Sequence, residues 1–247
     1  MKALVFLSIL CAMSSLEAQP IDSAAAAILR MSEFKVMKSD RRADSLNGTF
    51  HVSVSFTSDV IGKESRAKSA YLVTIERGDH AGIEPIGKPT ASDSTASNLM
   101  RREAASHLDK SGIRIFNSAF PWKPIIARSN GNYKFASEVS SDSTVIYGKS
   151  CYLIEFSLDA EGDSMNAQGG GKIWIERSSL LPVRTYDDLV VSTSRGKAEV
   201  IAFSDFRLLP KGIPVLVKSE IRTVPKFLFV KVGLIRVIIE QSDFNLE

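Results

Sequence analysis

The chain has 247 residues, 44% of them hydrophobic and 24% charged, and a formal net charge of +3 at pH 7. This composition is ordinary for a globular protein, and so small a positive charge argues against nucleic-acid binding, which needs a strongly basic surface. The length suits one large domain, because sandwiches and barrels of this size commonly form a single unit.

Residues 1–18 have the pattern of a cleavable signal peptide. Lys2 supplies the positive charge, residues 3–13 form the apolar segment, and residues 16–18 form a cleavage site. We therefore expect residues 19–247 to be exported to the periplasm as a single domain. An alternative is a lipoprotein anchored at Cys11, although Leu10 is bulky where a lipidation signal has a small residue.

The two cysteines predict no disulfide. Cleavage of the signal peptide would remove Cys11 and leave Cys151 alone, so the fold would depend on its hydrophobic core. Cys151 lies in a strand-like segment, residues 150–158, where a buried structural thiol is expected rather than a nucleophile. No later apolar segment is long and uncharged enough to span a bilayer, so we expect membrane contact to be peripheral.

Residues 24–38 predict a helix capped by Asp22 or Ser23. One stripe at helical spacing contains Ala24, Ala27, Ile28, Met31 and Phe34. Leu29 and Val36 lie on the opposite side, so both faces of this helix are expected to be covered.

Residues 49–56 and 69–77 predict two strands, because apolar and polar residues alternate in both. The apolar positions are Phe50, Val52, Val54 and Phe56 in the first strand and Tyr71, Val73 and Ile75 in the second. Since paired strands share a face, we place these side chains together on the concave side of a sheet, with the first helix across them.

Residues 78–95 predict a loop and residues 94–108 a second helix. The rest of the chain predicts short strands at 113–117, 132–138, 143–148, 150–158, 171–177, 182–191, 197–207, 212–223 and 226–240, the last broken near Gly233. The glycines at 169–171 permit a tight reversal, and a second reversal near 178–181 precedes Pro182. Many strands with little helix predict an antiparallel sheet curled into a barrel or half-barrel.

No set of residues predicts catalysis. His51, His80 and His107 are far apart and form no metal-binding motif, and the chain has no nucleophile elbow, phosphate-binding loop or dinucleotide fingerprint. We therefore expect no catalytic residue, no metal and no cofactor, and a protein that is not an enzyme.

Several strands carry bulky side chains on both faces, among them residues 152–156 and 172–176. A sheet with one face in water does not need this. One interpretation is that helices and the far wall cover both faces as ordinary core. The other is that a curved sheet lines a cavity for an acyl chain or a lipidated partner, closed by the two helices.

The order of these segments resembles the LolA/LolB-like superfamily of bacterial lipoprotein carriers. The resemblance lies in "YLIEF" (152–156), "KIWIERSSLLPVRTY" (172–186), and "FSDF" (203–206) followed by "GIPV" (212–215). It implies a mainly β (α+β) fold: a curved antiparallel half-barrel of about eleven strands whose helical lid closes over lipoprotein acyl chains or a lipid. Carriers of this superfamily latch the lid with an arginine on an early strand. Here residues 50–56 contain none, and Arg66 is expected in or beside the following turn, so that role is not carried over.

The expected function is therefore a periplasmic carrier for lipoprotein acyl chains or lipids in outer membrane lipoprotein sorting, acting as a monomer, with an envelope protein as a further partner. The expected lining and lid residues are Ile28, Met31, Phe34, Phe50, Val52, Val54, Phe56, Tyr71, Val73 and Ile75. The alternative is a structural or protein-interaction domain of the envelope whose barrel is filled by its own side chains.

Overall fold

The computed structural model describes residues 23–94, 97–98, 113–141, 144–194, 196–209, 212–227 and 230–247. The expected signal peptide, Cys11 and most of the expected helix at 94–108 lie outside these residues. None of the helices in the described ranges is long and apolar enough to cross a membrane.

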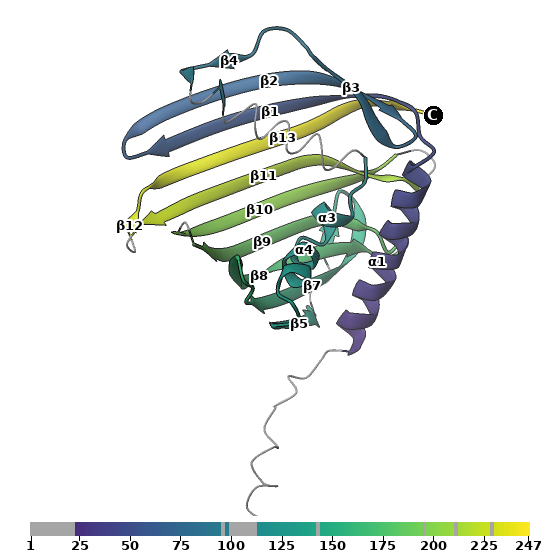
Figure 1. The fold of residues 1–247 in the computed structure, drawn as a ribbon. Helices are drawn as coiled ribbons and strands as arrows, with labels where there is room; N and C mark the ends of the chain where they lie inside the picture. The colour runs from purple at the N-terminus through teal and green to yellow at the C-terminus, as the bar shows by residue number, and fades with distance from the viewer. Residues whose placement is uncertain are drawn as a thin grey trace, which may run out of the picture.

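One antiparallel sheet forms most of the described chain (Figure 1). Its strands are β1 (Gly48–Val60), β2 (Lys63–Glu76), β3 (Asp79–Pro85), β4 (Thr90–Ala91), β5 (Tyr133–Val139), β6 (Thr144–Ile146), β7 (Lys149–Ala160), β8 (Met165–Glu176), β9 (Pro182–Thr193), β10 (Gly196–Leu208), β11 (Pro214–Phe227), β12 (Val230–Lys231) and β13 (Gly233–Leu246). The spatial order is β3-β2-β1-β13-β11-β10-β9-β8-β7-β5, and the short strands β4, β6 and β12 pair with β2, β7 and β11.

The sheet is open, because β3 and β4 form one edge and β5 and β6 the other. This confirms the predicted half-barrel class. Within the described residues the sheet has thirteen strands, more than the predicted eleven because it includes very short strands. Strand β13 lies between β11 and β1, so the last strand joins the two parts of the sheet.

Three helices within the described ranges lie against one face of the sheet, which we call the inner face. They are α1 (Ser23–Ala43), α3 (Phe116–Ala119) and α4 (Trp122–Arg128). Figure 1 shows α1 crossing the ends of the strands, while α3 and α4 lie in front of the strands near β5. Their apolar side chains share a buried cluster with the inner-face residues Ile154, Phe156 and Ile173.

Helix α1 uses a different stripe from the predicted one. Its buried positions are Ala25, Leu29, Ser32, Val36, Ser39 and Ala43, which recur at helical spacing. Met31 and Phe34 are instead 46% and 67% exposed, so their predicted place in the lining is wrong. The prediction placed only Leu29 and Val36 of this stripe on the buried side, because the small residues between them have low hydropathy. The expectation that both faces of the helix are covered is wrong.

The segment predicted as a strand at 113–117 leads into α3 instead. The carboxylate of Asp40 on α1 accepts hydrogen bonds from the backbone N–H groups of Ile115 and Phe116, both at 3.1 Å. These two donors are thus satisfied by a side chain rather than by a neighbouring strand.

The segment predicted as a loop at 78–95 also differs from the prediction, because it contains β3 and β4.

The glycines at 169–171 lie inside β8 rather than in a reversal. A Cβ atom at Gly171 would lie 2.6 Å from Cζ of Phe156 and 2.2 Å from the carbonyl oxygen of Tyr186. Glycine is therefore needed because neighbouring atoms come so close. The second predicted reversal, near 178–181, is confirmed.

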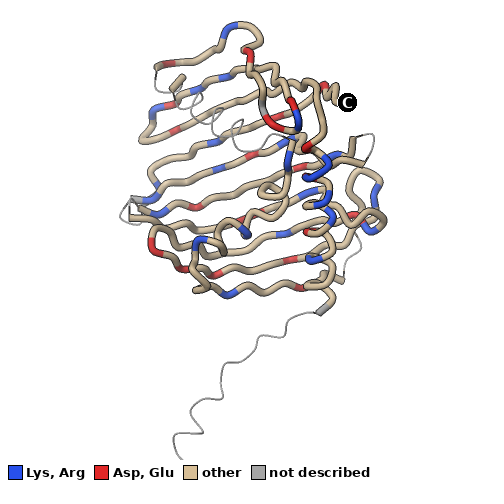
Figure 2. Tube along the Cα trace, turned by 45° about the vertical axis from the view of Figure 1, so that its right-hand side comes forward, with Lys and Arg blue, Asp and Glu red and all other residues tan. Residues whose placement is uncertain are grey.

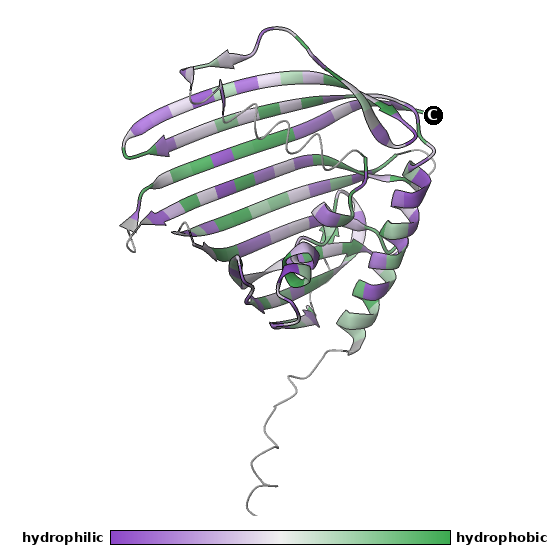
Figure 3. Ribbon diagram, in the orientation of Figure 1, coloured by the Kyte–Doolittle hydropathy of each residue, from purple (hydrophilic) through white to green (hydrophobic). Residues whose placement is uncertain are grey.

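On the outer face of the sheet, charged side chains of neighbouring strands form ion pairs. Lys218 on β11 contacts Glu240 on β13 at 2.9 Å, and Glu220 contacts Arg236 on the same two strands at 2.8 Å. Figure 3 shows hydrophobic and hydrophilic residues alternating along these strands. One face therefore supplies the core while the other carries charges, as expected for an antiparallel sheet.

Cys151 is fully buried, as predicted, and burial raises the pKa of its thiol. Only a thiolate reacts readily with disulfide reagents, and it must be accessible. We expect Cys151 to react with a chromogenic disulfide at least about a hundredfold more slowly in the native protein than in denaturant. Stopped-flow absorbance measures both rates, and similar rates would contradict the buried position.

Candidate functional site

The predicted strand residues come together on the inner face, as the register requires. Val54 on β1 pairs with Ile239 on β13, and Phe56 pairs with Val237. All the predicted positions on β1 and β2 belong to this cluster: Phe50, Val52, Val54, Phe56, Val73 and Ile75 are at most 2% exposed, and Tyr71 packs against them partly buried. These side chains are enclosed by other residues of the chain, including Ala43 at the end of α1 and Leu46 just after it.

A second cluster is rich in aromatic rings and lies under α3 and α4. The ring centroid of Trp122 on α4 is 4.4 Å from that of Phe156 on β7 and 5.5 Å from that of Phe135 on β5. Phe120 packs edge-on against Trp122 at 5.6 Å. The bare backbone at Gly171 leaves room for the ring of Phe156. Ile28, the remaining predicted lid residue, packs against this cluster partly buried.

A cavity of about 350 Å³ opens beside this aromatic cluster, between α1, α4 and β5. Its lining residues are Ala26, Leu29, Arg30, Glu33, Trp122, Lys123, Ile126, Tyr133, Phe135, Ala136 and Ser137. Glu33 and Lys123 form an ion pair of 2.9 Å across the two helices. The volume is at the lower end of the range of about 300–1,000 Å³ seen in ligand sites. Its walls combine apolar side chains with charged and polar ones. Sequence reasoning missed this cavity because it did not predict α4.

An acidic residue interrupts the inner face. Asp187 on β9 is 4% exposed, and its Oδ1 makes no hydrogen bond within the described chain. Its neighbours across the sheet are Gly171 on β8 and Ala202 on β10, which offer neither a donor nor a charge in their side chains. Burial alone raises the pKa of Asp187 to about 7. The alternation along β9 could have revealed this position, since Asp187 falls between Thr185 and Leu189 on one face.

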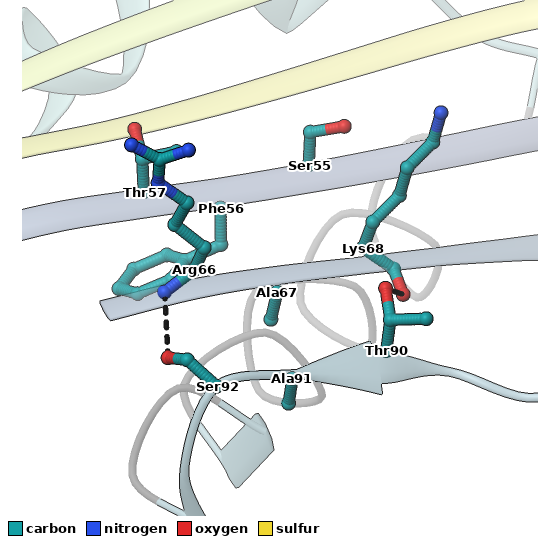
Figure 4. A pocket seen from close by; sticks show the side chains of 9 residues that line it. All are labelled: Ser55, Phe56, Thr57, Arg66, Ala67, Lys68, Thr90, Ala91 and Ser92. Atoms are coloured by element: carbon teal, nitrogen blue, oxygen red, sulfur yellow. Dashed lines mark hydrogen bonds between the residues drawn. The ribbon is translucent and has the colours of Figure 1, made fainter. Parts of the chain in front are cut away.

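Arg66 lies within β2 rather than in or beside a turn. Its guanidinium pairs with the carboxylate of Glu64 on the same strand and is exposed. A second pocket, of about 370 Å³, lies next to Arg66 where β4 meets the sheet edge (Figure 4). Figure 4 shows the backbone N–H of Arg66 bonded to the hydroxyl of Ser92, at 2.9 Å. This edge pocket is lined by hydroxyl and basic side chains together with Phe56, Ala67 and Ala91, so it has one aromatic side chain where the first cavity has three.

Metal binding has no support in the described ranges, where no group of at least three possible ligands comes together. The most perturbed carboxyl, Asp187, also has no nucleophile or base beside it on the neighbouring strands. What the cavity offers is an apolar wall, which includes Leu29, Trp122 and Phe135, beside the charged side chains of Arg30, Glu33 and Lys123.

No known protein-family model and no curated protein matches the chain. Similar solved structures include a DUF1329 family protein from Desulfovibrio piger, with 12% identity, coverage of 88% of this chain and 91% of that chain, and a TM-score of 0.32. A protein domain from Vibrio parahaemolyticus assigned to outer membrane lipoprotein sorting has 9% identity, coverage of 88% and 92%, and a TM-score of 0.36. MucB in complex with MucA(peri) has 9% identity, coverage of 88% and 94%, and a TM-score of 0.23.

Proposed function

We propose that this protein is a non-enzymatic periplasmic carrier that binds an acyl chain of a lipoprotein, or a lipid, in the cavity between α1, α4 and β5. The observation that carries the proposal is the aromatic and aliphatic wall of that cavity, formed by Leu29, Trp122 and Phe135 beside an open sheet edge. An acyl chain is the ligand that such a wall suits, since it needs apolar contact and few directed hydrogen bonds.

Release from this site would need movement of α1. Each buried methylene contributes about 0.8 kcal/mol, so a long acyl chain leaves slowly unless its cover opens. Helix α1 packs on the core through Leu29 and Val36, while its other buried positions, which include Ala25, Ser32 and Ser39, bury little apolar area. A helix that buries few large side chains separates from a sheet at lower cost than one that buries many, which suits a lid.

A second candidate function is a structural or protein-interaction domain of the envelope with a self-filled interior. It is favoured by the first cluster, in which Phe50, Val54 and Phe56 are at most 2% exposed without any ligand. In that case the cavity beside α4 would be a packing defect, and no apolar ligand would bind to it.

The neighbours Ala26 and Ala27 on α1 provide a matched test. Ala26 lines the cavity, whereas Ala27 is exposed and does not. We expect Ala26→Phe to weaken uptake of a fluorescent fatty acid at least about tenfold by filling the cavity, and Ala27→Phe to leave it unchanged. Fluorescence titration gives both dissociation constants, and urea unfolding checks that the variants are folded.

Equal binding by the two variants would place the ligand elsewhere. If the parent protein, although folded, binds neither fatty acids nor other apolar probes, the self-filled domain is the better interpretation.

A further inference from the structure

Helix α1 carries apolar side chains on the side that faces away from the sheet. Met31, Phe34 and Met37 are 46%, 67% and 44% exposed, and their spacing of three residues puts them on one side of the helix. Leu29 and Val36, on the opposite side, are buried against the core. Single exposed apolar side chains are common on protein surfaces, but three large ones gathered on one helix face form a candidate contact surface.

The charges on this outward side are all positive. Arg30, Lys35, Lys38, Arg41 and Arg42 are exposed, and none forms an ion pair with the part of the chain that the structure describes. Lys and Arg residues are seen along α1 in Figure 2.

The two acidic residues of α1 are engaged elsewhere. Glu33 pairs with Lys123 on α4, and the carboxylate of Asp40 accepts the N–H groups that precede α3. Both contacts lie toward the helices on the inner face. The acids therefore do little to neutralise the outward side of α1.

We propose that the outward face of α1 docks this protein on an anionic lipid bilayer. Met and Phe side chains enter the boundary between headgroups and acyl chains, while Lys and Arg side chains extend to the lipid phosphates. A nucleic acid would match the charge but not the apolar residues, and a second copy of this face would bring like charges together. The inference goes beyond the proposed carrier function and does not depend on it.

Docking through α1 would bring the cavity close to the membrane, because α1 forms one wall of it through Ala26 and Leu29. The same helix would then meet the bilayer with one side and cover the site with the other. A carrier with this arrangement could open its site where lipid is exchanged.

Flotation with lipid vesicles tests the proposal on the protein without added ligand. We expect binding to phosphatidylglycerol vesicles at least about tenfold stronger than to phosphatidylcholine vesicles, and weaker at high salt, since the attraction is partly electrostatic. Phe34→Ser is expected to weaken the binding about tenfold. Its control is Val145→Ser, which changes a 65% exposed residue on β6 and should leave binding unchanged.

A charge pair completes the test. Lys38→Gln with Arg41→Gln is expected to weaken binding by about tenfold or more, while Lys63→Gln with Lys68→Gln on β2 has little effect. Absence of binding to anionic vesicles, or equal loss in variants and controls, would overturn the proposal. The proposal would also be overturned if the protein bound no vesicles but associated with itself, and if Phe34→Ser abolished that association. The outward face of α1 would then contact a second copy of the chain. Fatty-acid uptake without vesicle binding would overturn the docking surface and leave the carrier function standing.

Discussion

Val54→Asp is expected to prevent folding, or to lower the free energy of unfolding by at least about 4 kcal/mol. Val54 is fully buried on β1, between Ser69 on β2 and Ile239 on β13. An aspartate there would lose its hydration in an apolar cluster that contains no cation to pair with it. Urea unfolding followed by circular dichroism measures the loss.

Ser53→Asp is the matched control, because it introduces an aspartate at the neighbouring position, whose side chain lies on the other face of the sheet. Ser53 is only half-buried and faces the polar side of the sheet. We expect its cost to stay below about 1 kcal/mol. If the two variants were equally tolerated, the assignment of Val54 to the inner face would have to be abandoned.

Asp187→Asn is expected to stabilise the protein at pH 8, by up to about 4 kcal/mol. The pKa of Asp187 is about 7 in the folded chain, against an ordinary value of 3.8 for an aspartate carboxyl. Because the folded-state value is raised, the native state retains a proton that the unfolded chain releases. The contribution of Asp187 to stability therefore falls as pH rises from about 4 to 7 and stays low above that range.

The neutral amide of the variant removes this dependence, so the difference from the parent protein should vanish near pH 4 and be largest at pH 8. The other titrating groups contribute equally to the free energies of unfolding of the variant and the parent protein, so their contributions cancel in the difference. The positions that face Asp187 on the sheet, Gly171, Ala202, Thr185 and Leu189, carry no charge. Asp188→Asn, on the exposed side of the same strand, should change stability little at either pH. A difference for Asp187→Asn that is equal at pH 4 and pH 8 would show that the carboxyl is not desolvated.

Period-two alternation was the most informative part of the sequence. It located β1, β2 and most later strands, and it put Phe50, Val54 and Ile75 on one face, because a slip of one residue would turn every side chain over. The broken final strand was also anticipated, since β12 ends shortly before Gly233, where β13 begins.

The helices were harder to predict. Their position depends on small buried residues and on a contact with a residue far away in the sequence. Most of the buried stripe of α1 consists of small residues such as Ala25, Ser32 and Ser39. Met31 and Phe34 have higher hydropathy and drew the assignment to the wrong side. Helix α3 begins where Asp40 caps its backbone, a contact between segments 75 residues apart. The cavity depends on α4, so it could not be found without that helix.

The pairing of β1 with β13 affects how the chain folds. The hairpins from β7 to β11 join strands that are neighbours in sequence, as does the hairpin of β1 and β2. The second partner of β1, β13, lies close to the other end of the chain. Closing so long a loop is slow, because its entropy is lost before the strand contacts are gained. Until β13 pairs with β1, the apolar face of the β1–β2 hairpin and the unpaired backbone edge of β1 are a template for aggregation. The rate at which β13 docks therefore decides how long the folding chain remains prone to aggregation.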